Sequence, residues 1–164
     1  MRTGIGYDIH RLSDDRKMIL AGIEIDYEQG LLGYSDADVV IHAICDAILG
    51  AASLGDIGRH FPDTDMQYKD ISSLKLLDSV REKINQKNYE VNNVDVTIVC
   101  EKPKLNPYIE AMEEKLSDVL KIRKNDINVK ATTNEGLGSI GESKAVASWA
   151  VATIIPTPDY IKHK

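Results

Sequence analysis

The chain has few of the features that mark secreted, membrane or nucleic-acid-binding proteins. It contains only two cysteines in 164 residues, which predicts reduced core thiols rather than a disulfide framework. No signal-peptide pattern and no apolar run of membrane length are found, so we expect a cytoplasmic protein with no membrane partner. The net charge of −6 argues against a general nucleic-acid-binding surface. An anionic ligand would therefore need metal ions or local lysines.

What the sequence does have is enough apolar residues for one core. Hydrophobic residues make up 43% of the chain, a fraction typical of a globular protein. The length fits one well-filled domain and is too short for two ordinary ones. We expect a single domain over residues 1–155 and a polar tail over residues 156–164.

Apolar periodicity predicts a mixture of strands and helices. We expect strands over 2–10, 91–100 and 127–133, a short hairpin or two small strands within 11–34, a buried helix over 39–49, and amphipathic helices over 70–87 and 107–120. Ser72 or Ser73 is expected to cap the helix over 70–87. The segment 145–155 fits a helix or a strand, and its pattern does not decide between them. The simplest fold is an α+β sheet with helices on one side.

The helix over 39–49 is almost entirely apolar. Its polar exceptions, Asp38, His42 and Asp46, are four residues apart and therefore share one side. Ser35 and Asp36 precede the helix and are expected to cap its free amide groups. Two interpretations stand at this point. One is a buried histidine beside a solvated acidic turn, and the other is a binding edge mounted on a core helix.

A possible metal site links this helix to the first strand. Asp8 and His10 are two residues apart, so on a strand both side chains point to the same face. An ordinary surface pair is the alternative unless a third ligand lies nearby, and His42 is the best candidate. Two histidines and one carboxylate leave a fourth position open, as a catalytic zinc ion requires. His60 and His163 are poorer candidates.

Four segments carry a resemblance to a known family. They are GYDIHRL at 6–12, LLGYSDADVVIHAICDAILGAASLGDIGRHFPDTD at 31–65, NVDVTIVCEKPKL at 93–105 and NVKATTNEGLG at 128–138. Together, in order and in register, they resemble the 2-C-methyl-D-erythritol 2,4-cyclodiphosphate synthases of the non-mevalonate isoprenoid pathway. The resemblance implies a two-layer α+β sandwich with a mixed sheet and helices on one side. It also implies a homotrimer with active sites between subunits.

The same resemblance implies a reaction and its cofactors. The expected enzyme is a phosphorus–oxygen lyase acting on a cytidine diphosphate substrate, 4-diphosphocytidyl-2-C-methyl-D-erythritol 2-phosphate. The 2-phosphate attacks the β-phosphorus, CMP leaves, and the cyclic diphosphate forms. Zn²⁺ is expected on Asp8, His10 and His42. Mg²⁺ or Mn²⁺ is expected to bridge the substrate diphosphate with Glu135 as its ligand, and Thr133 to stabilise the transition state.

Residues that match the family's substrate contacts fall into three groups. Besides the ligands Asp8, His10 and Glu135, the implied contacts are Tyr34 and Thr133 at the phosphates, with Ser35, Thr132 and Asn134 beside them in the chain. The others are Asp56, Ile57, Gly58, Phe61, Pro62, Asp63, Thr64 and Asp65 at the erythritol hydroxyls, and Cys100, Glu101, Lys102, Pro103, Lys104, Leu105 and Asn106 at cytidine. Cytosine is expected to be recognised largely by backbone groups.

The sequence departs from the common family pattern in two places. Tyr34 stands where histidine is frequent, and we expect the catalytic phosphate-orienting role to be kept by its hydroxyl or by neighbouring backbone groups. Glu142 and Lys144 stand where some members carry an arginine and then a glutamate near the trimer axis. This reversed order predicts weak binding of geranyl or farnesyl diphosphate there. The alternative functions are a zinc phosphohydrolase and a non-catalytic trimeric sensor of nucleotides or isoprenoid diphosphates.

Overall fold

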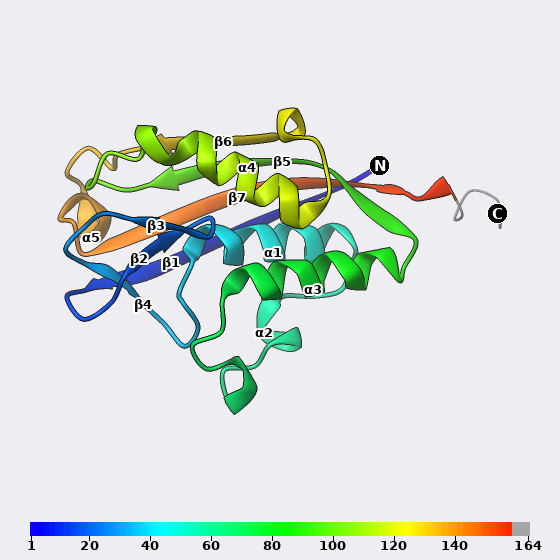
Figure 1. Cartoon of the computed structure of the whole chain (residues 1–164), viewed down its shortest axis with the longest axis horizontal. Coiled ribbons are helices and arrows are strands. Elements are labelled where there is room, and N and C mark those ends of the chain that lie inside the picture. Colours follow the sequence, from blue (N-terminus) through cyan, green and yellow to red (C-terminus); the bar gives the residue numbers. More distant parts are fainter. Residues whose placement is uncertain (159–164) are drawn as a thin grey trace.

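A five-stranded sheet forms one layer of the molecule, and helices cover one of its faces (Figure 1). The structure is a computed structural model that describes residues 1–158. The sheet has the order β4 (Gly30–Leu32), β1 (Arg2–Ser13), β7 (Ala145–Pro156), β5 (Tyr89–Val99) and β6 (Ile127–Thr132). The pair β5–β6 is parallel and the other pairs are antiparallel, so the sheet is mixed. The expected two-layer α+β fold is confirmed.

The covering layer contains three long helices. They are α1 (Val39–Ala51), α3 (Ser73–Asn85) and α4 (Ile109–Leu120). Two one-turn helices, α2 (Ile57–His60) and α5 (Gly138–Gly141), lie in loops, and β2 (Met18–Leu20) pairs with β3 (Ile23–Ile25) in a separate hairpin. Of the helices in the described part of the chain, none combines the length and apolar character needed to cross a membrane.

The segment whose pattern did not decide between helix and strand is β7, which lies between β1 and β5. Ala150 and Ala152 are buried on the helical side, whereas Trp149 and Val151 are 47% and 39% exposed on the other side. Because both sets are apolar, the sequence lacks the alternation of apolar and polar residues that indicates a strand. The strand continues to Pro156, one residue past the expected domain end, and residues 159–164 of the expected tail lie outside the described residues.

Helix α1 lies directly on β1 because two glycines leave room for it. A Cβ atom on Gly6 would lie 1.9 Å from the carbonyl oxygen of Ala43, and one on Gly4 would lie 2.0 Å from that of Ala47. Both distances are far inside van der Waals contact, so any side chain at these positions would push the helix away. The close approach brings His42 of α1 next to Asp8 of β1.

Ser72 is the N-cap residue of α3, one of the two expected, although its side chain makes no capping hydrogen bond, whereas the expected cap of α1 is wrong. Asp38 is the N-cap of α1, and its carboxylate accepts the amide protons of Val40 and Ile41, as well as those of residues 21 and 22 in the β2–β3 turn. Asp38 is fully buried, and burial raises its pKa to about 6 against the effect of these hydrogen bonds. Asp36 instead accepts the amide proton of Ser73, the first residue of α3. Several neighbouring residues in this stretch have capping side chains, so the sequence did not single out Asp38.

Candidate functional site

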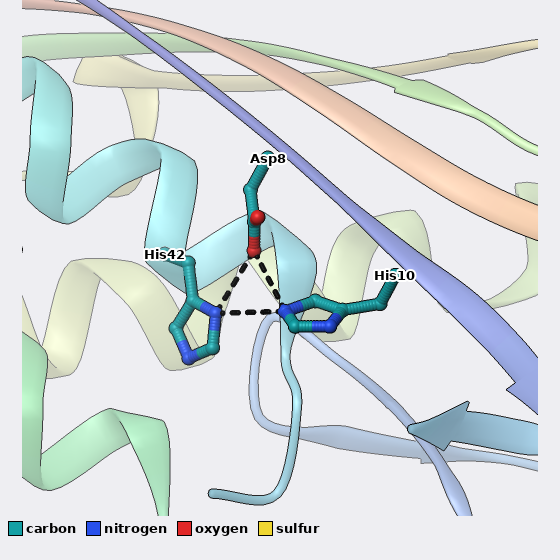
Figure 2. A group of neighbouring side chains, drawn as sticks. All are labelled: Asp8, His10 and His42. Atoms are coloured by element: carbon teal, nitrogen blue, oxygen red, sulfur yellow. Dashed lines mark hydrogen bonds and ion pairs between the residues drawn. The ribbon is translucent and has the colours of Figure 1, made fainter. Parts of the chain in front are cut away.

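Three side chains converge between β1 and α1 (Figure 2). The Oδ2 atom of Asp8 lies 3.0 Å from Nε2 of His10 and 2.9 Å from Nδ1 of His42, and the two nitrogens are 3.2 Å apart. Ligand atoms of a tetrahedral zinc ion with bonds of about 2.0 Å are separated by about 3.3 Å. The three atoms therefore fit one metal ion, and the trio expected from spacing forms a candidate metal site.

A hydrogen bond to the backbone fixes the orientation of His10. Its Nδ1 atom lies 2.9 Å from the carbonyl oxygen of Leu32 on β4, and a carbonyl can only accept a hydrogen bond. Nδ1 therefore carries the proton when the ring is neutral, and Nε2 is left with its lone pair toward Asp8. Strand β4, which the sequence analysis did not predict, thus supports the metal site.

The charges at the site favour a negative aspartate. Burial would raise the pKa of Asp8, but hydrogen bonds from His10 and His42 and their positive charge hold it well below its usual value. Burial lowers the pKa of His10, yet the hydrogen bond and charge of Asp8 outweigh this effect and raise it overall. Without a metal ion, the Asp8 charge favours a proton on His10, and a bound cation would take over the balancing of that charge.

A cavity of about 250 Å³ opens beside His10 and His42. Besides His10, five residues expected to contact substrate line it, namely Tyr34, Ser35, Ile57, Phe61 and Asp63. The cavity also contains Tyr68 and Leu76, which the sequence analysis missed. Tyr68 lies in the 66–68 turn and Leu76 on α3, and neither position stands out in the sequence.

Loop contacts shape the wall of this cavity. Asp46 accepts the amide proton of Ile57 at 2.7 Å, and Asp56 caps α2 by accepting the amide proton of Arg59 at 3.0 Å. The hydroxyl of Tyr34 donates to the carbonyl oxygen of Asp65 at 3.2 Å. Gly58, Pro62, Thr64 and Asp65, the remaining expected erythritol contacts, belong to the same loop.

A second cavity, of about 280 Å³, lies at the ends of β5 and β6. Its lining contains eight of the residues expected to contact cytidine and phosphate, and these are Cys100, Glu101, Pro103, Lys104, Leu105, Asn106, Thr132 and Thr133. The Lys102 carbonyl accepts the thiol proton of Cys100 at 2.9 Å. Burial raises the pKa of Cys100 to about 11, so this thiol stays protonated at neutral pH and is not a nucleophile.

The turn that carries Glu135 is anchored by Glu101. One oxygen of the Glu101 carboxylate accepts the amide protons of Asn134 at 2.7 Å and Gly136 at 3.2 Å. Between them, Glu135 has a φ of 51° and its carboxylate accepts the hydroxyl proton of Thr133 at 3.3 Å. Glu101 therefore fixes the shape of the turn, a role that the sequence analysis did not predict.

Within one chain the two cavities are separate. The first lies around β1 and α1 and the second at the ends of β5 and β6, with β7 between β1 and β5. The two cavities share no lining residue. Farther along the chain, Glu142 and Lys144 form an ion pair with each other at 2.5 Å.

The chain was compared with families and with curated proteins. Residues 1–155 match the model of the YgbB family. A protein of Lachnospira eligens named 2-C-methyl-D-erythritol 2,4-cyclodiphosphate synthase is 55% identical over 161 residues, which are 98% of this chain and 88% of that protein. A protein of Clostridioides difficile with the same name is 52% identical over 157 residues, 96% of this chain and 98% of that protein.

Solved structures agree with these matches. The bifunctional IspDF from Campylobacter jejuni has a TM-score of 0.90 and 40% identity, and the match covers 93% of this chain but 42% of that longer one. The CDP complex of IspF from Plasmodium falciparum has a TM-score of 0.83 and 36% identity, with 95% of this chain and 96% of that chain covered. The chain therefore belongs to the YgbB family.

Proposed function

We propose that this chain is a lyase that closes 2-C-methyl-D-erythritol 2,4-cyclodiphosphate from 4-diphosphocytidyl-2-C-methyl-D-erythritol 2-phosphate and releases CMP. The observation that carries the proposal is the convergence of Asp8, His10 and His42 beside a cavity, in a chain of the YgbB family. An oxygen of the 2-phosphate forms a bond to the β-phosphorus. The bond from that phosphorus to the oxygen shared with the α-phosphate breaks, and the electron pair leaves with CMP.

The metal sites follow from the chemistry of the donor atoms. Asp8, His10 and His42 would hold Zn²⁺, and Glu135 would hold Mg²⁺ or Mn²⁺ with the substrate diphosphate. When bound, these ions supply the positive charge that offsets repulsion between the reacting phosphates. The chain's own part is to hold its ligand atoms in place and to fold the substrate back on itself. The Thr133 hydroxyl is a hydrogen-bond donor for the diphosphate.

The two cavities suggest where each part of the substrate would bind. The erythritol hydroxyls would lie against the loop of residues 56–65, where the carboxylates of Asp56 and Asp63 accept hydrogen bonds from paired hydroxyls. The cytidine would lie in the second cavity against residues 100–106. Tyr34 would orient phosphate, and its hydroxyl must then turn away from the Asp65 carbonyl, because it has only one proton to donate.

A homotrimer would bring the two cavities together. One substrate must reach the metal ligands with its β-phosphate and the second cavity with its cytidine, and the two regions lie on different parts of one chain. The face of the sheet opposite the helices exposes Ile5, Tyr7 and Ile9, which suits burial against other copies. We propose that the first cavity of one copy meets the second cavity of its neighbour. The free cysteines, Cys45 and Cys100, support a cytoplasmic location.

Product identity tests this function. We expect the purified protein with Zn²⁺ and Mg²⁺ to convert the substrate into CMP and a cyclic diphosphate, which phosphorus NMR distinguishes from linear phosphates. CMP accompanied by a linear phosphate would instead identify a phosphohydrolase that uses water as the nucleophile. Tight substrate binding without release of CMP would identify a sensor. A His42→Ala variant provides the control, because it removes one metal ligand.

A further inference from the structure

The outer nitrogen of His42 contacts two buried serines. Its Nδ1 atom faces Asp8 and His10, and its Nε2 atom lies on the far side of the ring (Figure 2). Nε2 lies 3.1 Å from the Oγ atom of Ser73 and 3.2 Å from that of Ser35. Ser73 is 0% exposed and Ser35 is 7% exposed, so water does not compete freely for these contacts.

The hydroxyl proton of Ser73 is donated to Asp36. Ser73 Oγ donates a short hydrogen bond to Oδ1 of Asp36, and the Oδ2 atom of the same carboxylate accepts the Ser73 amide proton at 2.9 Å. A carboxylate only accepts hydrogen bonds, so the direction of the Ser73–Asp36 contact is fixed. Ser73 is then left with its oxygen lone pairs toward His42.

This direction favours the tautomer of His42 that can bind a metal ion. Ser73 offers only an acceptor, and Ser35 can direct its own hydroxyl proton to the Ser73 oxygen, 3.5 Å away, so that Nε2 of His42 donates its proton to Ser73. In the neutral ring, Nδ1 is then unprotonated and free to bind a metal ion. Were the Ser73 proton free instead, it would be donated to Nε2, and the neutral ring would place its own proton on Nδ1, where the metal ion must bind.

We propose that Ser73 is a positioning residue for the metal site and that Asp36 orients it. The inference rests on the proposed metal site of Asp8, His10 and His42. The Asp36–Ser73–His42 chain selects the metal-binding tautomer and holds the ring at a fixed angle. Outer contacts of this kind change metal affinity by about 10- to 100-fold when they are removed. Ser73 is the first residue of α3, so the start of this helix supports the metal site from the side opposite Asp8 and His10.

Zinc affinity, measured by competition with a chromophoric chelator, tests the inference. We expect Ser73→Ala to weaken zinc binding by about 10- to 100-fold. Asp36→Ala should weaken it by at least tenfold although Asp36 does not contact His42, because it frees the Ser73 proton. The matched control is Ser72→Ala, since the neighbouring serine makes no capping hydrogen bond to α3, and its zinc affinity should equal that of the wild type.

Nitrogen-15 NMR of the imidazole groups separates this role from a general loss of structure. In the zinc-loaded wild type, the Nε2 proton of His42 should exchange slowly with water because it is donated to Ser73, and in Asp36→Ala this protection should be lost while the circular dichroism stays unchanged. If Ser73→Ala does not fold, Ser73→Cys keeps the side-chain size, and its weak thiol acceptor should still lower the zinc affinity by about tenfold. Unchanged zinc affinity and unchanged protection of the Nε2 proton in the folded variants would overturn the inference alone. Failure of the wild type to bind zinc would overturn the metal site as well.

Discussion

Tyr7 and Trp149 lie side by side on the face of the sheet that no helix within residues 1–158 covers, with their ring centroids 4.4 Å apart. The two residues are directly paired across β1 and β7. Their neighbours Ile5 and Val151 form the next pair and are 66% and 39% exposed. A contiguous apolar strip of this kind in a monomer is a protein-interaction surface in most cases. Under the proposed assembly, this strip is where the three copies meet.

A charge in this strip should therefore prevent assembly. We expect the wild type to sediment as a trimer and Trp149→Asp as a single chain at the same concentration, because each copy would bury an unpaired carboxylate. Gln86→Asp is the control, since Gln86 is exposed at the end of α3, on the helical side of the sheet. A Trp149→Asp protein that remains trimeric would place the interface elsewhere.

The close contact between α1 and β1 predicts opposite effects at two glycines. Gly6→Ala should lower the free energy of unfolding by about 3 kcal/mol, because its Cβ would collide with the backbone of α1. Gly50→Ala should raise it by about 1 kcal/mol, since a Cβ at this exposed helical position meets no atom within 4 Å and alanine is the better helix former. Guanidinium unfolding at matched protein concentration measures both. A Gly6→Ala variant as stable as the wild type would contradict the packing described above.

The ion pair of Asp8 and His10 predicts how the stability of the metal-free protein depends on pH. The folded pKa of Asp8 lies below its unfolded value of about 3.9, so its contribution is present above about pH 4 and is lost as the pH falls through the folded value. The folded pKa of His10 is raised, so its contribution is complete below about pH 6.5 and is lost as the pH rises through the folded value.

The contributions of Asp8 and His10 to the free energy of unfolding are both present in full only between about pH 4 and about pH 6.5. With a chelator in the buffer, Asp8→Asn should therefore reduce the stability more at about pH 5.5 than at about pH 8.5. Asp70→Asn is the control, because its exposed pair with Arg16 spans 3.5 Å and should matter little at either pH. An equal cost of Asp8→Asn at the two pH values would show that the pair does not stabilise the metal-free fold.

How far the sequence predicts this molecule depends on whether the residue type marks a role. The metal trio was predictable, although His42 lies 34 residues from Asp8, because histidine is scarce and is a common metal ligand, and because the strand and helix periods fix which side each residue faces. The roles of Ser73 and Glu101 were not, although their partners lie at a similar range of 37 and 33 residues. Serine and glutamate have many possible hydrogen-bond partners, and no local pattern shows which of them is used.

The same distinction applies to the elements. Strands and helices with one apolar face were predicted close to their observed bounds. Strand β4 was missed because it has three residues and gains its hydrogen bonds only from β1. The small α2 and α5 helices were missed for a similar reason, since four residues leave no periodic signal.

Subunit mixing tests whether one active site is built from two copies of the chain. His42→Ala and Glu135→Ala should each be nearly inactive alone, because each loses a metal ligand of the proposed reaction. After the two variants are unfolded and refolded together in equal amounts, about one quarter of the sites should combine an intact His42 with an intact Glu135 from the neighbour. We expect CMP release and cyclic diphosphate formation to recover to about that fraction of the wild-type rate. Mixed trimers that stay inactive, beside a refolded wild type that is active, would contradict this shared site.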